Sequence, residues 1–569
     1  MSDVAIKFTD FGFKYKAQQE PTLYDINLEI KTGEKVLILG GSGSGKSTLA
    51  NCINGLIPFS YEGTITGSVT VNGRSTLESS IFGLSKVVGT VLQDSDAQFV
   101  GLSVGEDIAF ALENAMIPRS EMVPIVDERA SVVGMLDFIR AIPFELSGGQ
   151  KQKVAIAGVY GNEVNILIFD EPLASLDPKM GQTAIELIDD ICNNSGCTVI
   201  VIEHRLEDVL HRPVDRVILM AEGRIVAETT PDELLRSSLL AQHGIREPLY
   251  ITAMKYAGCS LATTQNLCDI ETIQFSPVDT ARLKTFFQTE TAPIEFDLGE
   301  PLVELSNVFY AYDRDYVLED VSFFVRKGER VAVVGKNGAG KSTTARLICG
   351  VGRPNKGRIS ICGKDAKDLS IKEIGEHVAF VMQNPNEMLI KDIIKKEVEL
   401  ALEIRSIPTD EIIKKATAAL TACRLYSMRN WPVDMVSYGQ KKRITIASML
   451  VLEPQVLILD EPTAGQDYRS YTDIMRFVEE LNHEYGITII FITHDMHLAL
   501  EHTDRAIVFA DGKLVADERV FSVLSDDEVI TRANLKQTSL YTLAKKIGLE
   551  PEAVIRHFIE HERVVRPRE

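Results

Sequence analysis

The chain has 569 residues, of which 45% are hydrophobic, and its 60 basic and 81 acidic residues give a net charge of −21. A chain this acidic repels nucleic acid unless it has a local basic face, and its longest apolar runs, such as TVIVIEH, are much shorter than the roughly 18 residues that a membrane helix needs. Its length predicts two large domains with accessory segments.

The amino-terminal sequence MSDVAIKFTD has neither a basic segment nor an apolar core, so we expect no secretory signal and a cytosolic chain. Eight cysteines are scattered without any C-x-x-C pair. This spacing favours buried thiols in a reducing compartment.

The first chemical motif is a phosphate-binding loop. Residues 40–47 fit the pattern G-x-x-x-x-G-K-S, after the strand-like run KVLIL and before a helical pattern. Glycines here let backbone N–H groups point at phosphates at the positive end of the helix. Lys46 is then predicted to reach the β- and γ-phosphates, and Ser47 to bind magnesium. The alternative is a glycine-rich turn that binds nothing.

The second motif is an apolar run, ILIFD, that ends in the acid pair Asp170 and Glu171. The run has the length of a buried parallel strand, and ligand sites lie at the carboxyl ends of such strands. Asp170 is predicted to hold magnesium, and Glu171 to orient or deprotonate the attacking water. An apolar run before two acids is weak evidence when it stands alone.

Both motifs recur later in the chain. Residues 335–342 fit the phosphate-loop pattern again, with Lys341 and Ser342 in the same places, and VLILD ends in Asp460 and Glu461. Four pairs of residues are separated by 290 positions: Gln93 and Gln383, Ser147 and Ser437, Asp170 and Asp460, and His204 and His494. We therefore predict two copies of one domain, over residues 1–230 and 301–525.

With LSGGQ (146–150) between the phosphate loop and the acid pair, the sequence resembles the ATP-binding cassette (ABC) ATPases over both copies. The resemblance implies an α/β fold of two tandem P-loop NTPase domains, each with a mainly parallel sheet core, a helical subdomain and an antiparallel β subdomain. The second copy reads VSYGQ, so Tyr438 stands where the first has Gly148. A helix start tolerates ordinary negative φ, so we expect Tyr438 to point into the surface and both sites to hydrolyse ATP.

The resemblance implies that the chain binds two ATP molecules with Mg²⁺, held head to tail between its two cassettes. The nucleotide-binding residues that it implies are Tyr15, Gly40, Gly41, Ser42, Gly43, Ser44, Gly45, Lys46, Ser47, Thr48, Gln93, Ser147, Gly148, Gly149, Gln150, Asp177, Tyr312, Gly335, Lys336, Asn337, Gly338, Ala339, Gly340, Lys341, Ser342, Thr343, Gln383, Ser437, Tyr438, Gly439, Gln440 and Asp467. The implied magnesium ligands are Ser47, Gln93, Asp170, Ser342, Gln383 and Asp460. The implied catalytic residues are Glu171, His204, Glu461 and His494. Each could be explained singly by packing, but their recurrence in order favours function.

The segment AQFVGLSVGEDIAFALEN, after Gln93, resembles the ATPases of energy-coupling factor transporters, the cobalt- and vitamin-type importers. This finer resemblance implies two partners: an integral membrane scaffold protein and a small substrate-binding membrane protein. We therefore expect a peripheral protein on the cytoplasmic side of the cell membrane, whose ATP hydrolysis drives import of a micronutrient, either a vitamin or a transition-metal ion. The second copy keeps this segment less well.

The middle insert, residues 231–300, bears on the alternative function, a soluble tandem ABC ATPase that acts on ribosomes or nucleic acid. The insert begins with a helical pattern and holds five basic and ten acidic residues. Translation-acting relatives have a long, highly charged helical linker, and DNA-repair members have zinc-binding C-x-x-C pairs. Neither feature is present, so no nucleic-acid partner is expected.

Within the helical carboxyl-terminal tail, residues 526–569, the segment TSLYTLAKKIGLEPEAVIRHFIEH reads as two short helices, the first stopped by Gly548 and the second begun at Pro551. This pattern is typical of a DNA-binding helix-turn-helix, but also of a helical hairpin that packs on the second cassette or on a partner. The overall acidity favours the hairpin.

Overall fold

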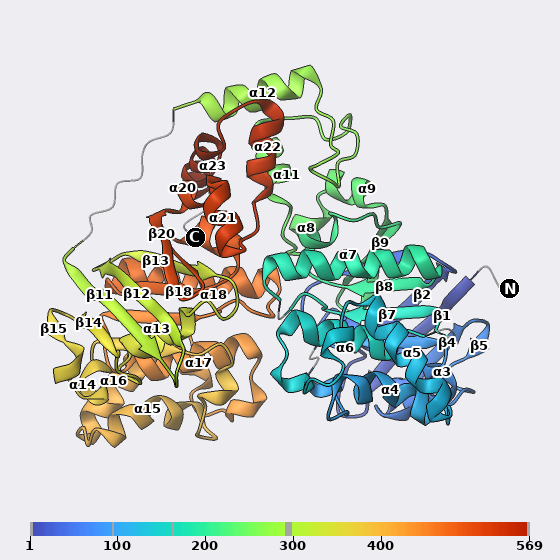
Figure 1. Ribbon diagram of the computed structural model, residues 1–569, viewed down its shortest axis with the longest axis horizontal. Helices are drawn as coiled ribbons and strands as arrows, with labels where there is room; N and C mark the ends of the chain where they lie inside the picture. The colour runs from blue at the N-terminus through green and yellow to red at the C-terminus, as the bar shows by residue number, and fades with distance from the viewer. Residues whose placement is uncertain (1–3, 94–95, 162–163, 175, 291–298, 566–569) are drawn as a thin grey trace. The chain divides into compact units, whose positions relative to one another are not determined.

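The computed structural model describes residues 4–93, 96–161, 164–174, 176–290 and 299–565. By internal contacts the chain forms two units, residues 1–280 with 467–469, and residues 281–466 with 470–569 (Figure 1). Residues 291–298 of the predicted middle insert and 566–569 of the tail lie outside the described residues.

Unit 1 contains a six-stranded sheet in the order β10-β9-β3-β8-β7-β6, whose neighbours are parallel except for the antiparallel edge strand β10. These strands are β3 (Lys35–Leu39), β6 (Val88–Val91), β7 (Ile166–Asp170), β8 (Thr198–Ile202), β9 (Arg216–Ala221) and β10 (Arg224–Thr229). Strands β3 and β8 are buried at every position, as expected for apolar runs covered on both faces.

An antiparallel sheet, ordered β2-β1-β4-β5, shares a hydrophobic core with this parallel sheet. Its strands are β1 (Val4–Tyr15), β2 (Leu23–Lys31), β4 (Gly63–Val71) and β5 (Arg74–Ser75). The helices of unit 1 are α1 (Lys46–Ile53), α2 (Leu56–Phe59), α3 (Ile81–Ser85), α4 (Val104–Asn114), α5 (Arg119–Val132), α6 (Gly148–Val159), α7 (Pro178–Ser195), α8 (Leu206–Val209), α9 (Pro231–Arg236), α10 (Leu239–Gln242) and α11 (Leu249–Tyr256). Helices α4, α5 and α6 contact one another and form the helical subdomain.

Unit 2 repeats this architecture. Its six-stranded sheet runs β16-β17-β18-β13-β19-β20, with β20 antiparallel, and its antiparallel sheet runs β12-β11-β14-β15. The strands are β11 (Pro301–Ala311), β12 (Tyr316–Arg326), β13 (Arg330–Gly335), β14 (Lys356–Ile361), β15 (Lys364–Asp365), β16 (Val378–Val381), β17 (Val456–Asp460), β18 (Thr488–Ile492), β19 (Arg505–Ala510) and β20 (Lys513–Arg519). Both units therefore have the predicted cassette fold.

Helix α12 (Pro277–Gln288) passes from unit 1 into unit 2. The helices that follow are α13 (Lys341–Ile348), α14 (Ile371–Ile374), α15 (Ile394–Ile404), α16 (Thr409–Ala422), α17 (Tyr438–Leu450), α18 (Tyr468–Tyr485), α19 (Met496–His502), α20 (Val520–Ser525), α21 (Asp527–Ala533), α22 (Ser539–Ile547) and α23 (Pro551–Val565). Helices α15, α16 and α17 form the second helical subdomain.

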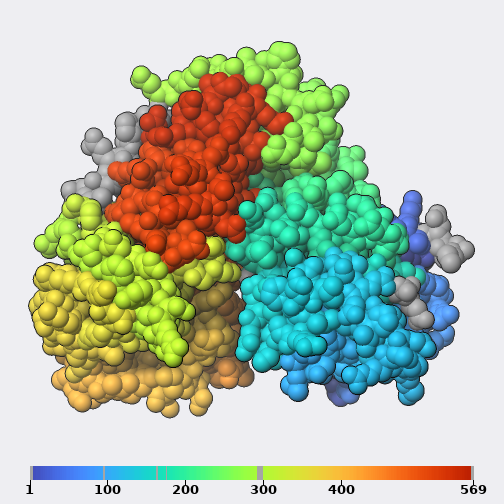
Figure 2. Space-filling model, in the orientation of Figure 1, coloured from blue at the N-terminus to red at the C-terminus, as the bar shows by residue number. Residues whose placement is uncertain are grey.

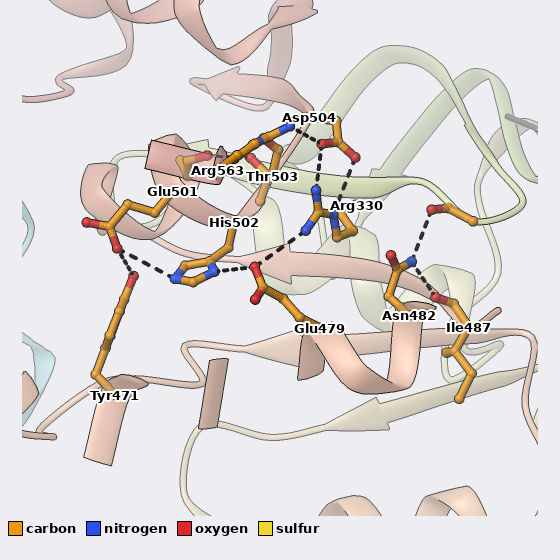
Figure 3. A network of polar contacts seen from close by, with 12 residues as sticks. Arg330, Tyr471, Glu479, Asn482, Ile487, Glu501, His502, Thr503, Asp504 and Arg563 are labelled. Atoms are coloured by element: carbon orange, nitrogen blue, oxygen red, sulfur yellow. Dashed lines mark hydrogen bonds and ion pairs between the residues drawn. The ribbon is translucent and has the colours of Figure 1, made fainter. Parts of the chain in front are cut away.

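The tail contains α21 and then the two predicted helices, because Gly548 caps α22 in a left-handed conformation and α23 begins at Pro551. These helices pack on unit 2 itself, where their red surface in Figure 2 is continuous with the rest of the unit. Figure 3 shows their polar anchor: Arg563 lies 3.1 Å from Asp504, which also pairs with Arg330 at the start of β13.

Candidate functional site

The phosphate loop of unit 1 joins β3 to α1. Gly43 and Gly45 have φ values of 75° and 100°, and a Cβ on Gly45 would lie 2.7 Å from Leu23, so a larger residue at this turn would be strained. Lys46 lies inside the loop, and its ammonium group donates to the carbonyls of Gly40 and Gly41 at 2.8 and 2.9 Å. Burial lowers the pKa of Lys46, which the nearby acids Glu171 and Asp170 partly oppose.

The loop of unit 2 has the same geometry. Lys341 donates to the carbonyls of Gly335 and Lys336 at 2.7 and 2.9 Å, and Gly340 has a φ of 103° before α13. The predicted aromatic residues lie beside both loops. Tyr15 Oη is 3.2 Å from Thr48 Oγ1, and Tyr312 Oη is 3.2 Å from Thr343 Oγ1.

Two of the three predicted magnesium ligands of each unit, the serine and the aspartate, meet at the carboxyl end of its sheet. Ser47 donates to Asp170 at 3.2 Å, and Ser342 donates to Asp460 at 3.2 Å. Hydroxyl and carboxylate oxygens are the donors that Mg²⁺ prefers. Burial raises the pKa of Asp460 to about 6, helped by the charge of Glu461. A bound cation would relieve this cost, so the residues present fit a magnesium ion in each cassette.

Among the residues that the structure describes, a buried hydroxyl of the first phosphate loop also lacks a hydrogen-bond partner that a phosphate could supply. Within the described chain, the buried Ser44 Oγ of the first phosphate loop makes no hydrogen bond. A buried hydroxyl without a partner is costly, and a ligand oxygen would satisfy it.

The second acids, Glu171 and Glu461, are held differently in the two units. Glu171 accepts a hydrogen bond from Gln93 Nε2 at 2.7 Å, and its carboxylate lies 3.9 Å from His204 Nδ1. Glu461 instead lies 2.6 Å from His494 Nδ1. Burial raises the pKa of Glu171 to about 7, and the next largest cause is the charge of Glu203.

Glu203 is a site residue that the motif analysis missed. It follows β8 directly, its side chain is fully buried, and it accepts a hydrogen bond from the backbone of Leu173, two residues beyond Glu171. The counterpart in unit 2 is Thr493. The signal in the sequence is the change from IEH to ITH.

The signature segments begin helices. Ser147 and Ser437 are the N-caps of α6 and α17, and each forms a capping box with the glutamine three residues later. The side chains of Gln150 and Gln440 are thus engaged in their caps. Among the described residues, these caps make no hydrogen bond to the phosphate loop of their own unit.

Tyr438 is the first residue of α17 and is not among the residues with positive φ, so the capping box accommodates it without strain. Its side chain is 40% exposed and donates from Oη to the backbone carbonyl of Gln383 at 3.2 Å. Gly148 has no side chain that could make this contact.

A further pair of residues was not predicted. Gln152 donates to the Pro172 carbonyl at 2.8 Å, and Lys442 donates to the carbonyls of Glu461 and Pro462, both at 2.8 Å. Each side chain ties the signature helix of its unit to the segment that carries the acid pair. Both residues stand five positions after the signature serine, which is the pattern that could have found them.

The remaining predicted residues lie in the turns before helices α7 and α18. Asp177 is the N-cap of α7 and accepts a hydrogen bond from Met180 at 2.9 Å. Asp467 directly precedes α18. Within each unit the structure therefore gathers the phosphate-loop lysine and serine, the acid pair and the histidine, and in unit 1 it also brings the glutamine Gln93 to the second acid.

The sequence is similar to known proteins over its full length. The sequence model of the family described as ABC transporter matches residues 23–174 and 318–464, and one described as ATP-binding cassette cobalt transporter matches residues 237–310. An ABC transporter ATP-binding protein of Enterococcus faecalis is 51% identical over 569 residues, covering 100% of both chains. Relatives of the same description from Vibrio vulnificus YJ016 and Clostridium perfringens are 50% and 51% identical over 565 and 563 residues, covering 98% or more of each chain.

A solved structure from Clostridium perfringens, titled cbiO1 and part of the ABC transporter complex cbiONQ, is 32% identical. The matched region covers 43% of this chain and 99% of the cbiO1 chain, with a TM-score of 0.39.

Proposed function

Because the chain belongs to the ABC transporter ATP-binding proteins, which are ATPases, we propose that it powers a membrane importer for a micronutrient, either a vitamin or a transition-metal ion. Both nucleotide-binding domains are in this one chain. The observation that carries the proposal is the match of residues 237–310 to a family described as ATP-binding cassette cobalt transporter.

Exposed apolar side chains support a membrane-protein partner. In unit 1, Val100 and Leu102 are 62% and 83% exposed, shortly after Gln93. In unit 2, Ile390 is 74% exposed at the equivalent place after Gln383. Large apolar residues exposed at equivalent positions of both units are suited to an interaction face. We propose that an integral scaffold protein, which carries a small substrate-binding membrane protein, docks on these two faces.

Membrane attachment is proposed to come through these partners, which would place the chain at the cytoplasmic face of the cell membrane. Among the helices of the described residues, none is both long enough and apolar enough to cross a bilayer. We retain the division into 1–230, 231–300, 301–525 and 526–569 as the proposed domain organisation.

For hydrolysis we propose the following roles. Lys46 and Lys341 leave the loop carbonyls that they now contact and bind phosphate oxygens. The Ser47–Asp170 and Ser342–Asp460 pairs hold magnesium, which neutralises phosphate charge when bound. Glu171 and Glu461 orient or deprotonate the attacking water, while His204 and His494 contact the γ-phosphate.

The test is to purify the chain from membranes under mild detergent and identify the proteins that accompany it. Replacing Leu102 and Ile390 with glutamate should release integral membrane partners without lowering ATP hydrolysis by the free chain. Nucleotide-dependent cosedimentation with ribosomes, in place of membrane partners, would favour the alternative of a translation factor.

A further inference from the structure

The two units differ at the residue just before the site histidine. Glu203 follows β8 in unit 1, and Thr493 follows β18 in unit 2. The backbone N–H of the histidine lies in a partly buried turn after the carboxyl end of a central strand, and in both units a side-chain carboxylate accepts its hydrogen bond. The two units supply that acceptor from different residues.

In unit 1 the acceptor is Glu203. Its carboxylate, which is fully buried, accepts from the backbone N–H groups of Leu173 and His204, both at 3.0 Å, and of Arg205 at 3.4 Å. A buried carboxylate is tolerated when backbone donors surround it in this way. Glu171 is therefore not needed by the turn, and its bond goes to Gln93.

In unit 2 the acceptor is the acid of the active site. The Thr493 hydroxyl does not accept from the histidine N–H: it accepts from Asp495 N at 2.9 Å and donates to Glu461 Oε2 at 3.4 Å. Glu461 Oε1 takes over, accepting from His494 N at 3.1 Å and lying 2.6 Å from His494 Nδ1. Within the described residues no hydrogen bond joins the Gln383 side chain to Glu461, unlike the Gln93–Glu171 bond of unit 1.

We propose that Glu203 is a positioning residue that releases Glu171 for its work on the attacking water. Glu203 accepts the hydrogen bonds of the backbone N–H groups in the histidine turn, so Glu171 remains bonded to Gln93. In unit 2, Glu461 is bonded to His494. The two ATP sites are then unequal before ATP binds, because Glu461 must give up three hydrogen bonds, to Thr493 Oγ1, His494 N and His494 Nδ1, that have no counterpart at Glu171 in the described part of the chain. This inference rests on the proposed roles of Glu171 and Glu461.

The experiment exchanges the two residues in the full chain. In a Glu461→Gln background, where only the first acid remains, Glu203→Thr should slow single-turnover ATP hydrolysis at least fivefold. In a Glu171→Gln background, Thr493→Glu should speed it by a similar factor. Single-turnover rates are compared at saturating MgATP, because replacing Glu203 also removes a charge that acts on Lys46 of the phosphate loop.

A readout without nucleotide tests the hydrogen bonds directly. Hydrogen exchange of peptides covering residues 171–174 and 203–206 should become faster in Glu203→Thr. The matched control is Leu206→Met, which exchanges a buried neighbour for its unit 2 counterpart Met496 at similar volume. It should change neither exchange nor turnover.

The outcomes distinguish the proposed roles of Glu171 and Glu461 from the positioning role of Glu203. If the double variant Glu171→Gln and Glu461→Gln hydrolyses ATP at the normal rate, the proposed roles of the acids are wrong. If those acids matter but Glu203→Thr leaves turnover unchanged, with or without faster exchange, the positioning role is wrong. Should Glu203→Thr fail to fold, Thr493→Glu decides alone: no acceleration in the second site overturns the inference.

Discussion

Replacing Arg563 with alanine should loosen the carboxyl-terminal helix α23 from unit 2. Arg563 Nη1 lies 3.1 Å from Asp504, and Nη2 donates to the Thr503 carbonyl at 2.6 Å. Hydrogen bonds to charged groups contribute about 1.5–3 kcal/mol each. Asp504 keeps its second partner, Arg330 at 3.0 Å, so it is not left as a bare buried charge. We therefore expect the variant to lose about 1.5–3 kcal/mol of local stability, not the sum of both bonds.

The assay is hydrogen exchange of peptides within residues 551–565, measured on the full chain. A loss of that size should speed exchange by about 10- to 100-fold, because each 1.4 kcal/mol changes the opening equilibrium tenfold. Arg556→Ala is the matched control, since Arg556 is on the same helix and exposed. It should change exchange by no more than about twofold, as surface substitutions usually do.

Replacing Asp504 should loosen α23 more than replacing its partner Arg563. Asp504 is 2% exposed at its side chain and stands between two arginines, so Asp504→Ala leaves two cations without their shared anion. Breaking a buried pair in this way costs about 3–5 kcal/mol. Asp504→Ala should thus loosen α23 more than Arg563→Ala does. Equal exchange in Arg563→Ala and Arg556→Ala, or the reverse order of the two partners, would refute the argument.

Three further predictions concern the ATP sites. Lys46→Ala combined with Lys341→Ala should abolish Mg²⁺-dependent ATP hydrolysis, and neither RNA, DNA nor ribosomes should stimulate the unaltered chain; residual activity in the double variant would contradict this. Burial lowers the pKa of Lys442 to about 8, so unfolding takes up a proton between that pH and the ordinary lysine pKa. Urea titrations should therefore show unfolding free energy rising with pH from about 8 to 10.5 relative to Lys442→Gln, by up to about 3 kcal/mol, and a fall would reverse the sign argued here. Tyr438→Gly should alter ATP turnover by less than about tenfold, whereas Gly439→Asp, which sets a carboxylate against phosphate, should slow it far more; a larger loss in the first variant would show that the tyrosine is required.

The strands that carry the sites could be predicted because their signals are local. ILIFD and VLILD are uninterrupted apolar runs that end in charge, and the structure forms β7 and β17 over the same residues. The tail helices could be predicted for the same reason, since Gly548 and Pro551 act as stop and start signals. The hydrogen bonds that tie the signature helices to the acid-bearing segments could not be predicted from the sequence. Gln152 and Lys442 reach the acid-bearing segment through tertiary packing, which no local pattern encodes.

The packing partner of the tail was left open by the sequence for a related reason. Both a DNA-binding helix-turn-helix and a packed hairpin need an apolar face and a break between two helices. What separates them is where charged groups find partners, and Arg563 finds Asp504, a residue 59 positions earlier in the chain. Such a pairing depends on the fold of β13 and β19, so it emerges only with the structure.

The change from glycine to tyrosine at 438 is the visible irregularity of the repeat, yet the structure accommodates it within an intact capping box. The change from Glu203 to Thr493 lies outside the recognised motifs and redirects the bonds of the acid itself. The physical reason is that a backbone N–H away from water needs a hydrogen-bond acceptor. Where the longer Glu203 is replaced by Thr493, the nearby Glu461 carboxylate accepts that hydrogen bond. Sequence motifs identify residues that contact the ligand. A neighbouring residue that accepts a hydrogen bond from the same backbone N–H needs only a side chain long enough to reach it, so no motif identifies it. In tandem domains, a difference between two sites is therefore best sought among the residues that contact the motif residues. There, a change in side-chain length can move a hydrogen bond from one acceptor to another.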